Sequence, residues 1–249
     1  VAEDTRTLRH LMDIHGVALG GRPLWAYHDH NGAEVRPRIL ASLAEGKVVA
    51  YASEAGTPLV ADPGYQLGRA AIIDDHAVTA APGPSAALAA LTVSGLPSDR
   101  FLFAGFPPAT RQARQSWLAE FLGLKATLIF YESPNRIGEM LSDCVQTFGE
   151  MRPAVVCREL TKKFEETTRA PLGELAAAFT GERVKGEIVV LIDRESEARA
   201  DEGEVRAALV KAMGQMKVKE AAALVAGIYG VPKRDMYQLA LALGQERDK

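Results

Sequence analysis

Apolar residues recur along the chain in two patterns, one typical of amphipathic helices and one typical of short buried strands. Spacings of three and four predict helices over residues 7–14, 39–43, 67–74, 112–122 and 172–179, and an alanine-rich helix from Ser85 to Gly95. Compact β-prone runs predict strands over 23–27, 48–52, 77–81, 101–104, 127–131, 154–157 and 188–192. This alternation predicts an α/β fold with mostly parallel sheets.

Two further signals mark where elements begin. Ser133 followed by Pro134 has the order of an N-cap and a first-turn proline, which predicts a helix that runs to Phe148. Pro107 and Pro108 are the best candidate for a domain boundary. We therefore expect one α/β domain over 1–105, a second over 106–196 and a helical tail over 200–249.

The tail differs from the rest of the chain in pattern and in charge. It contains no strand signal, and it predicts helices over 204–214, 218–228 and 233–243, the last two joined by a Gly-Val-Pro turn over 230–232 that is typical of a helix-turn-helix. Between residues 205 and 240 there are six basic and two acidic residues, a net charge of +4, whereas the whole chain carries −3. A charge excess on a helix is usually a solvated face, but a basic surface against the overall sign is also a hint of a phosphate-bearing partner, and both interpretations stay open.

Composition narrows the class of protein. With 249 residues, 47% hydrophobic and 24% charged, the chain resembles an ordinary soluble globular protein of one or two domains. No apolar run approaches the roughly 18 residues that a membrane span needs. Cys144 and Cys157 form no CxxC pair, so we expect free thiols and a cytoplasmic location.

The loop after the predicted strand 48–52 is unusually long and rigid. Residues 53–64 include Gly56, Pro58, Pro63 and Gly64, whereas a strand-to-helix loop usually spans about 2–6 residues. Open sheets bind ligands beyond the carboxyl ends of their strands. This loop therefore predicts a binding site.

Three common chemistries lack their signatures. The chain contains no GxGxxG, no GxxxxGK[ST] and no GxSxG motif, which argues against Rossmann, P-loop and hydrolase chemistry. His28 and His30 are two positions apart, so on a strand their side chains would share one face and could bind a metal. No second ligand cluster accompanies them in the sequence, so we expect no metal. What does recur is small or rigid residues directly after predicted strands, at 53–58, 82–85, 105–108 and 132–136. Such turns can converge into a backbone-lined pocket for a nucleoside-like cofactor.

Several motifs resemble one enzyme family. Residues 53–65, SEAGTPLVADPGY, resemble the SDAGTPLISDPGY motif of the tetrapyrrole methylase superfamily. Further segments are similar to its branch that methylates the 2′-oxygen of a cytidine in small-subunit ribosomal RNA: AEDTR at 2–6, HDHN at 28–31, PGPS at 82–85, LPSDRF at 96–101, GFPP at 105–108, FYES at 130–133, RELT at 158–161 and KGE at 185–187. The resemblance covers essentially the whole chain.

The resemblance implies two α/β domains with a cofactor cleft between them, a helix-turn-helix-like tail, and usually a homodimer. The implied cofactor is S-adenosylmethionine, bound by Ser53, Ala55, Gly56, Thr57, Asp62, Pro82, Ser85, Glu132, Ser133, Arg158, Glu159, Leu160 and Gly186. The implied partner is small-subunit ribosomal RNA or the assembled 30S subunit. It would be contacted by Asp4, Arg6, His28, His30 and Asn31, with Lys217, Lys219, Lys233 and Arg234 of the basic tail.

Two departures from the family pattern set expectations. Glu54 stands where the family has aspartate, one methylene longer. The family also opens with a strand and a proline-glycine-asparagine loop ahead of the position where this chain begins. We therefore expect a core strand and one wall of the cofactor pocket to be missing from this polypeptide.

The expected reaction is transfer of a methyl group to a ribose 2′-oxygen, without a metal. A general base would help this poor nucleophile, and the candidates are His28, His30, Asp4 and Glu132. Glu132 and Asp4 also have structural alternatives, as ion-pair partners of Arg136 and Arg6. Two other functions stay open: methylation of a tetrapyrrole, and a catalytically impaired RNA-binding module.

Overall fold

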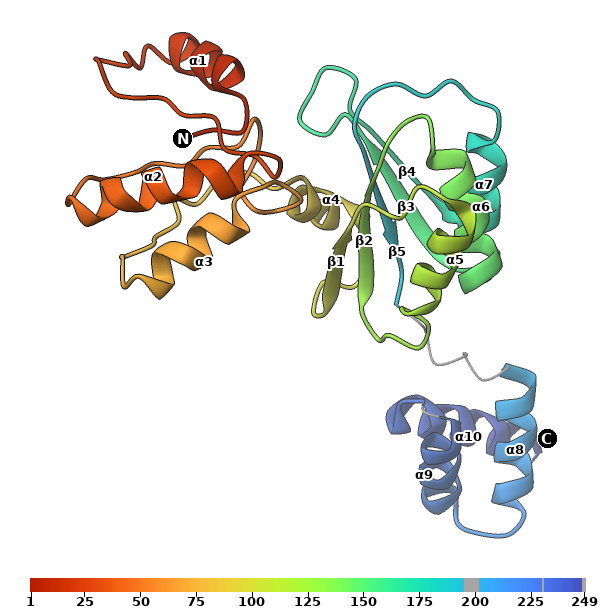
Figure 1. The fold of residues 1–249 in the computed structure, drawn as a ribbon. Helices are drawn as coiled ribbons and strands as arrows, with labels where there is room; N and C mark the ends of the chain where they lie inside the picture. The colour runs from red at the N-terminus through yellow and green to blue at the C-terminus, as the bar shows by residue number, and fades with distance from the viewer. Residues whose placement is uncertain (195–201, 230, 248–249) are drawn as a thin grey trace. The chain divides into compact units, whose positions relative to one another are not determined.

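The computed structural model of the protein describes residues 1–194, 202–229 and 231–247, and it is a mixed α/β structure (Figure 1). The chain divides into two compact units. The first contains Val1–Phe121 and Thr127–Ile192, and the second contains Leu122–Ala126 and Asp193–Lys249. Each unit is described by itself below.

Five strands in the described part of the first unit form one sheet, in the order β1-β2-β5-β3-β4. Their bounds are β1 Phe101–Gly105, β2 Thr127–Glu132, β3 Pro153–Arg158, β4 Glu166–Pro171 and β5 Ile188–Ile192. β1 and β2 pair in parallel, but the β2–β5, β5–β3 and β3–β4 pairs are antiparallel. The prediction of mostly parallel pairing was wrong, because β4 follows β3 after a short loop that permits only an antiparallel neighbour.

Alternating side chains give this sheet two buried faces. Leu128 and Phe130 of β2 point into a core formed with α5 (Arg111–Ala119), α6 (Ile137–Phe148) and α7 (Leu172–Phe179). Ile129, between them, joins the opposite core under α4 (Ala86–Ser94). Figure 1 shows α5, α6 and α7 together on one side of the strands. Strand burial on both faces explains the continuous apolar runs of β2 and β5.

The amino-terminal part of the first unit contains three helices but no named strand among its described residues. The helices are α1 (Thr5–Ile14), α2 (Gly32–Ala44) and α3 (Tyr65–Ile73), which confirms the helical spacing read from the sequence. The predicted strands over 23–27, 48–52 and 77–81 were wrong. Ala2 forms isolated bridges to Ala26 and Ala52, and Val48 is 97% exposed. Because the chain leaves this pairing at Asp4 to begin α1, the ladder extends no further.

Two more elements differ from the sequence prediction. α6 begins at Ile137, so Ser133 and Pro134 lie in the turn before it and do not cap it. β4 was not predicted, because its sequence ETTRAP has no apolar alternation. It lies at the edge of the sheet and is only partly buried, so it does not need an apolar face.

The second unit contains the three predicted helices, α8 (Glu202–Met213), α9 (Val218–Tyr229) and α10 (Lys233–Arg247). They bury a small core of their own around Leu209, Val225 and Ala240. Gly230 of the predicted turn lies outside the described residues. The domain bounds stay a proposal. β1, which precedes the expected boundary at 105–106, is hydrogen-bonded to β2 in the five-stranded sheet.

Both cysteines are free, as predicted, and both are buried. Burial raises the pKa of the Cys144 thiol well above its usual range, so this thiol is not reactive. A membrane-spanning helix would have to be longer and more apolar than any that the described residues form.

Candidate active site

The loop over residues 53–64 is fixed at both ends by side chains. Ser53 is buried, and its Oγ donates a hydrogen bond to the carbonyl oxygen of Gly56 at 2.8 Å. The Tyr51 hydroxyl donates to the carbonyl oxygen of Pro63 at 2.7 Å. Burial is the main cause that raises the pKa of Tyr51 to about 12, so its hydroxyl keeps its proton. The loop is therefore a preformed structure with an exposed tip.

A second turn, residues 82–85, is hydrogen-bonded to this loop. The Thr57 amide and the Thr57 Oγ1 both donate to the carbonyl oxygen of Pro84, at 2.9 and 3.0 Å. Gly56 has φ +76°, and a Cβ there would lie 3.3 Å from the same oxygen. Glycine is thus required at this position both by backbone conformation and by the close approach of the two turns.

Tyr131 connects these turns to the sheet. Its hydroxyl accepts a hydrogen bond from the Ala87 amide at 3.1 Å, at the start of α4, and it also interacts with Ser85. Its ring makes edge contacts with Phe103 and Phe106, at centroid distances of 4.7 and 5.6 Å. Tyr131 thus joins the turn over 82–85 to the turn over 105–108.

Arg136 fastens the turn over 132–136 to the turn over 105–108. Its Nη2 donates to the carbonyl oxygen of Pro107 at 2.6 Å and to Glu132 Oε2 at 3.0 Å. The other oxygen of Glu132 accepts from the Ser133 amide at 2.6 Å. These contacts link the four turns one to the next, while the pocket that they were expected to form together stays a prediction. Glu132 is 3% exposed and fully paired, which favours its structural alternative over a role as base.

The predicted cofactor residues after β3 form a compact cluster with Gly186. Glu159 has φ +51°, its amide donates to the Glu187 carbonyl oxygen, and its carboxylate accepts from the Glu187 amide, both at 2.9 Å. The bond from Glu187 and a contact with Lys162 hold the pKa of Glu159 below its usual range. A Cβ on Gly186 would lie 2.4 Å from Glu159 Cγ, so only glycine fits there.

Arg158 and Leu160, the other predicted cofactor residues after β3, make contacts beyond the cluster of Glu159 with Gly186. Arg158 donates to Glu166 Oε2 at 2.8 Å and to the Lys185 carbonyl oxygen at 3.3 Å. Leu160 packs into the same apolar cluster as Tyr131 and Ala87. Leu160 is therefore in the same apolar cluster as α4, the helix that follows the turn over 82–85.

Asp4 and Arg6, two residues expected to face RNA, bind each other. Asp4 caps α1: its Oδ1 accepts from the Arg6 amide at 2.7 Å, and its Oδ2 accepts from Arg6 Nη2 at 2.9 Å. These hydrogen bonds lower the pKa of Asp4 to about 2. So acidic a group is a weak base, and the structural alternative for Asp4 is the geometry observed.

His28 and His30 lie side by side, with ring centroids 6.0 Å apart. Asn31 fixes the backbone beside them: its Oδ1 accepts from the His28 amide at 2.9 Å, and its Nδ2 donates to the Ala26 carbonyl oxygen at 3.1 Å. The Nδ1 atom of His28 is buried and has no hydrogen-bond partner among the described residues. Of the four base candidates, Asp4 and Glu132 form ion pairs with arginines in the described structure, and the two histidines do not.

The described part of the first unit contains two cavities of about 320 Å³ each. One of them is lined by Tyr27, His28, Asp29, Gly32, Arg36 and residues 62–66. Asp62, a predicted cofactor residue, therefore lines the same cavity as His28. Burial raises the pKa of Asp62, while the Ser53 hydroxyl acts in the opposite direction.

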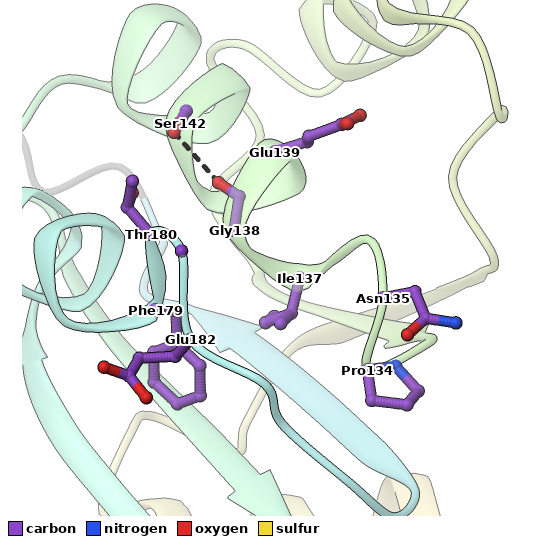
Figure 2. A pocket seen from close by; sticks show the side chains of 10 residues that line it. Pro134, Asn135, Ile137, Gly138, Glu139, Ser142, Phe179, Thr180 and Glu182 are labelled. Atoms are coloured by element: carbon purple, nitrogen blue, oxygen red, sulfur yellow. Dashed lines mark hydrogen bonds between the residues drawn. The ribbon is translucent and has the colours of Figure 1, made fainter.

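The other cavity lies between the start of α6 and the loop after α7, as Figure 2 shows. Its polar groups are partly engaged, since Ser142 donates to the Gly138 carbonyl oxygen at 2.9 Å and Glu139 pairs with Arg114 at 3.2 Å. None of the predicted site residues lines it.

In the second unit, the four basic residues expected to contact RNA are all exposed. Lys219 lies in the first turn of α9 and Lys217 directly before it, and Lys233 and Arg234 begin α10. Cations at helix N-termini oppose the helix dipole and are unfavourable without an anion. Glu220 and Asp235 in the same first turns offset part of this cost, and contact of the four cations with RNA stays a prediction.

Comparison with known proteins decides the family. Residues 17–176 match the profile described as tetrapyrrole (corrin/porphyrin) methylases, and residues 199–244 match the profile described as RsmI C-terminal HTH domain. A protein of Mesorhizobium japonicum named ribosomal RNA small subunit methyltransferase I is 46% identical over 97% of this chain and 81% of its own length. A protein of the same name from Escherichia coli O157:H7 is 41% identical, over 96% of this chain and 84% of its own length. The chain belongs to the tetrapyrrole methylase family.

Two solved structures share the fold. A conserved hypothetical protein, APE0931 from Aeropyrum pernix K1, matches with a TM-score of 0.55 at 15% identity, over 94% of this chain and 83% of that chain. The cobalt precorrin-4 methyltransferase CbiF matches with a TM-score of 0.51 at 17% identity, over 73% of this chain and 78% of that chain. At these identities the likeness concerns the fold alone.

Sequence reasoning missed three residues that organise this tetrapyrrole methylase site. Tyr131 lies within the quoted FYES motif, yet its role as a junction depends on partners 44 residues away. Tyr51 and Arg36 carry no motif and reach the site only through the fold. An aromatic residue with a hydroxyl at the end of a buried strand is the signal that could have identified Tyr131.

Proposed function

We propose that the protein transfers a methyl group from S-adenosylmethionine to the 2′-oxygen of a cytidine ribose in small-subunit ribosomal RNA. The observation that carries this proposal is that relatives named ribosomal RNA small subunit methyltransferase I are similar over nearly the whole chain, including the basic helical unit. A likeness confined to the methylase region would leave the substrate open.

The residues of the four linked turns fit a donor of this kind. Gly56 and Gly83 leave backbone accessible, and the nearest atom to a Cβ on Gly83 is Thr57 Oγ1 at 3.6 Å. Ser53 to Thr57, Pro82 to Ser85 and the cluster of Glu159 with Gly186 would hold the donor through main-chain groups and small side chains. When bound, S-adenosylmethionine supplies an electrophilic methyl group.

The protein contributes mainly by alignment. Thr57 and Tyr131 hold the turns in one arrangement before the donor binds, which removes the entropy cost of ordering them later. The ribose hydroxyl would lose its proton to His28 or His30, because Asp4 and Glu132 are held by arginines. Alanine replacement of both histidines should slow methylation while donor affinity is kept. An unchanged rate would contradict the assignment.

Two measurements test the function. Calorimetry with S-adenosylmethionine should show saturable binding, and no binding at millimolar donor would favour a non-catalytic RNA-binding module. Tritium transfer to small-subunit RNA, followed by nucleoside mass spectrometry, should give 2′-O-methylcytidine. Label on a base would overturn the proposed acceptor.

The alternative is methylation of a tetrapyrrole, because a structural neighbour is a cobalt precorrin-4 methyltransferase. The exposed cations of α9 and α10 favour RNA over such an acceptor. Incubation with a tetrapyrrole in place of RNA distinguishes the two. Faster label transfer to the tetrapyrrole would contradict the RNA proposal.

A further inference from the structure

The cavity beside His28 is built from the starts of two helices. Gly32, the first residue of α2, lines it, and so do Gly64 and Tyr65 at the start of α3. Neither helix has a side-chain cap, because Asn31 is engaged elsewhere and Gly64 has no side chain. The first turn of α3 also contains no acidic residue. At α2, however, the Gly32 amide donates to the His28 carbonyl oxygen and Glu34 lies in the first turn, so the free amides and the positive dipole end that face this space are those of α3.

Two side chains add donors to the same space. Arg36 lines the cavity, and its Nε donates to the Tyr27 hydroxyl at 3.3 Å, which fixes the direction of the guanidinium group. His28 contributes a buried Nδ1 that has no hydrogen-bond partner in the described part of the chain. A buried polar atom without a partner is uncommon and calls for an explanation such as a missing ligand.

The acidic residues of the cavity argue against a bare phosphate ion. Asp29 and Asp62 both line it and would repel a free dianion. Their oxygens are, however, suitable acceptors for sugar hydroxyl groups. Tyr65 is 64% exposed at the same wall and offers an aromatic face for stacking a base. Donors for an anion, acceptors for hydroxyls and an aromatic face together match one ribonucleotide.

We propose that this cavity binds one nucleotide of the RNA substrate. Its phosphodiester lies against Arg36 and the start of α3, its ribose hydroxyls meet Asp62 and His28, and its base stacks on Tyr65. The cavity volume of about 320 Å³ is at the lower end of the range of small-ligand sites. The inference rests on the proposed function, since it assigns a substrate site for the same reaction.

Protein-observed NMR with cytidine 5′-monophosphate tests the site without any methyl donor. The amide signals of residues 64–66 should shift with saturation. 2′-Deoxycytidine 5′-monophosphate and inorganic phosphate should each bind several-fold more weakly. Inorganic phosphate that binds as tightly as the nucleotide would overturn the nucleotide assignment, and so would the absence of shifts at these amides.

Arg36 and Arg38 provide a matched pair on one helix. Arg38 stacks over Trp25 at 4.5 Å and does not line the cavity. Arg36→Gln should weaken nucleotide binding about tenfold or more, as expected for loss of a charge-assisted hydrogen bond to phosphate, while Arg38→Gln should change it less than about twofold. Equal effects of the two variants would refute the site. If Arg36→Gln does not fold, Tyr65→Ala replaces it, since Tyr65 is mostly exposed.

The two proposals fail in different ways. If the wild-type protein binds S-adenosylmethionine and methylates RNA, but Arg36→Gln leaves KM for RNA unchanged, the cavity assignment is wrong and the function stands. If the wild-type protein binds no donor, the proposed function is wrong. The nucleotide titration then still decides whether the cavity is a nucleotide site.

Discussion

Two glycines with almost the same positive φ allow one prediction to be isolated from its side effects. Gly56 has φ +76° and Gly95 has φ +77°, both positive values that L-residues rarely adopt, so alanine at either position meets a conformational penalty of the same kind. For an L-residue in the left-handed region this penalty is about 1–2 kcal/mol. A Cβ on Gly95 meets nothing within 4 Å, whereas a Cβ on Gly56 lies 3.3 Å from the Pro84 carbonyl oxygen. Only Gly56→Ala therefore also pushes the two turns apart.

The expected results differ between stability and binding. Both variants should lose about 1–2 kcal/mol in free energy of unfolding, with Gly56→Ala at the upper end or beyond. Gly56→Ala alone should weaken S-adenosylmethionine binding. If about 1.4 kcal/mol of the cost of this substitution disfavours the donor-bound arrangement of the turns, the affinity falls about tenfold. Gly95 caps α4 away from this contact, so Gly95→Ala should keep donor affinity.

Urea unfolding followed by tryptophan fluorescence measures the stability term. Trp25 and Trp117 are the two tryptophans of the chain, and both lie in the first unit, so the signal excludes the helical unit. Calorimetry with S-adenosylmethionine measures the binding term. If Gly56→Ala binds the donor as tightly as Gly95→Ala does, the turn over 53–58 does not belong to the donor site. If Gly56→Ala is as stable as the wild type, the close approach to Pro84 is wrong.

Three further outcomes follow from the described contacts. Glu132→Gln should lower the free energy of unfolding by about 2–3 kcal/mol, measured by urea titration, because it leaves Arg136 without its charged partner in a mostly buried setting; a neutral effect would contradict the pair. The pKa of Asp4 in the folded protein is lowered to about 2. The difference in free energy of unfolding between the wild type and Asp4→Asn should therefore be fully present above the unfolded pKa near 4 and vanish as the pH falls through 2. Titration of the Asp4 carboxyl group near 4 by NMR would disprove this. Replacing Lys233 and Arg234 together by glutamine should reduce the slope of log affinity for RNA against log salt by about 1–2 while donor affinity stays constant, and an unchanged slope would exclude both from phosphate contact.

The sequence alone determined much of the local structure. Helical spacing located all ten helices of the described chain except for their ends, and the apolar runs of β2, β3 and β5 located the buried centre of the sheet. These signals are local, because burial of a face imposes its period on the residues of one segment. Motif resemblance also located the family.

The tertiary structure decided pairing and partnership, which depend on residues distant in the chain. β4 has no apolar signature, and it is a strand because β3 offers it an edge. Four residues qualified equally as bases by type, and the arginines beside Asp4 and Glu132 separated them from the histidines. The cavity beside His28 exists because α2 and α3 begin at one place, a fact that no single segment encodes. Side-chain chemistry can be read from the sequence, but the partner that uses or neutralises it is set by the fold.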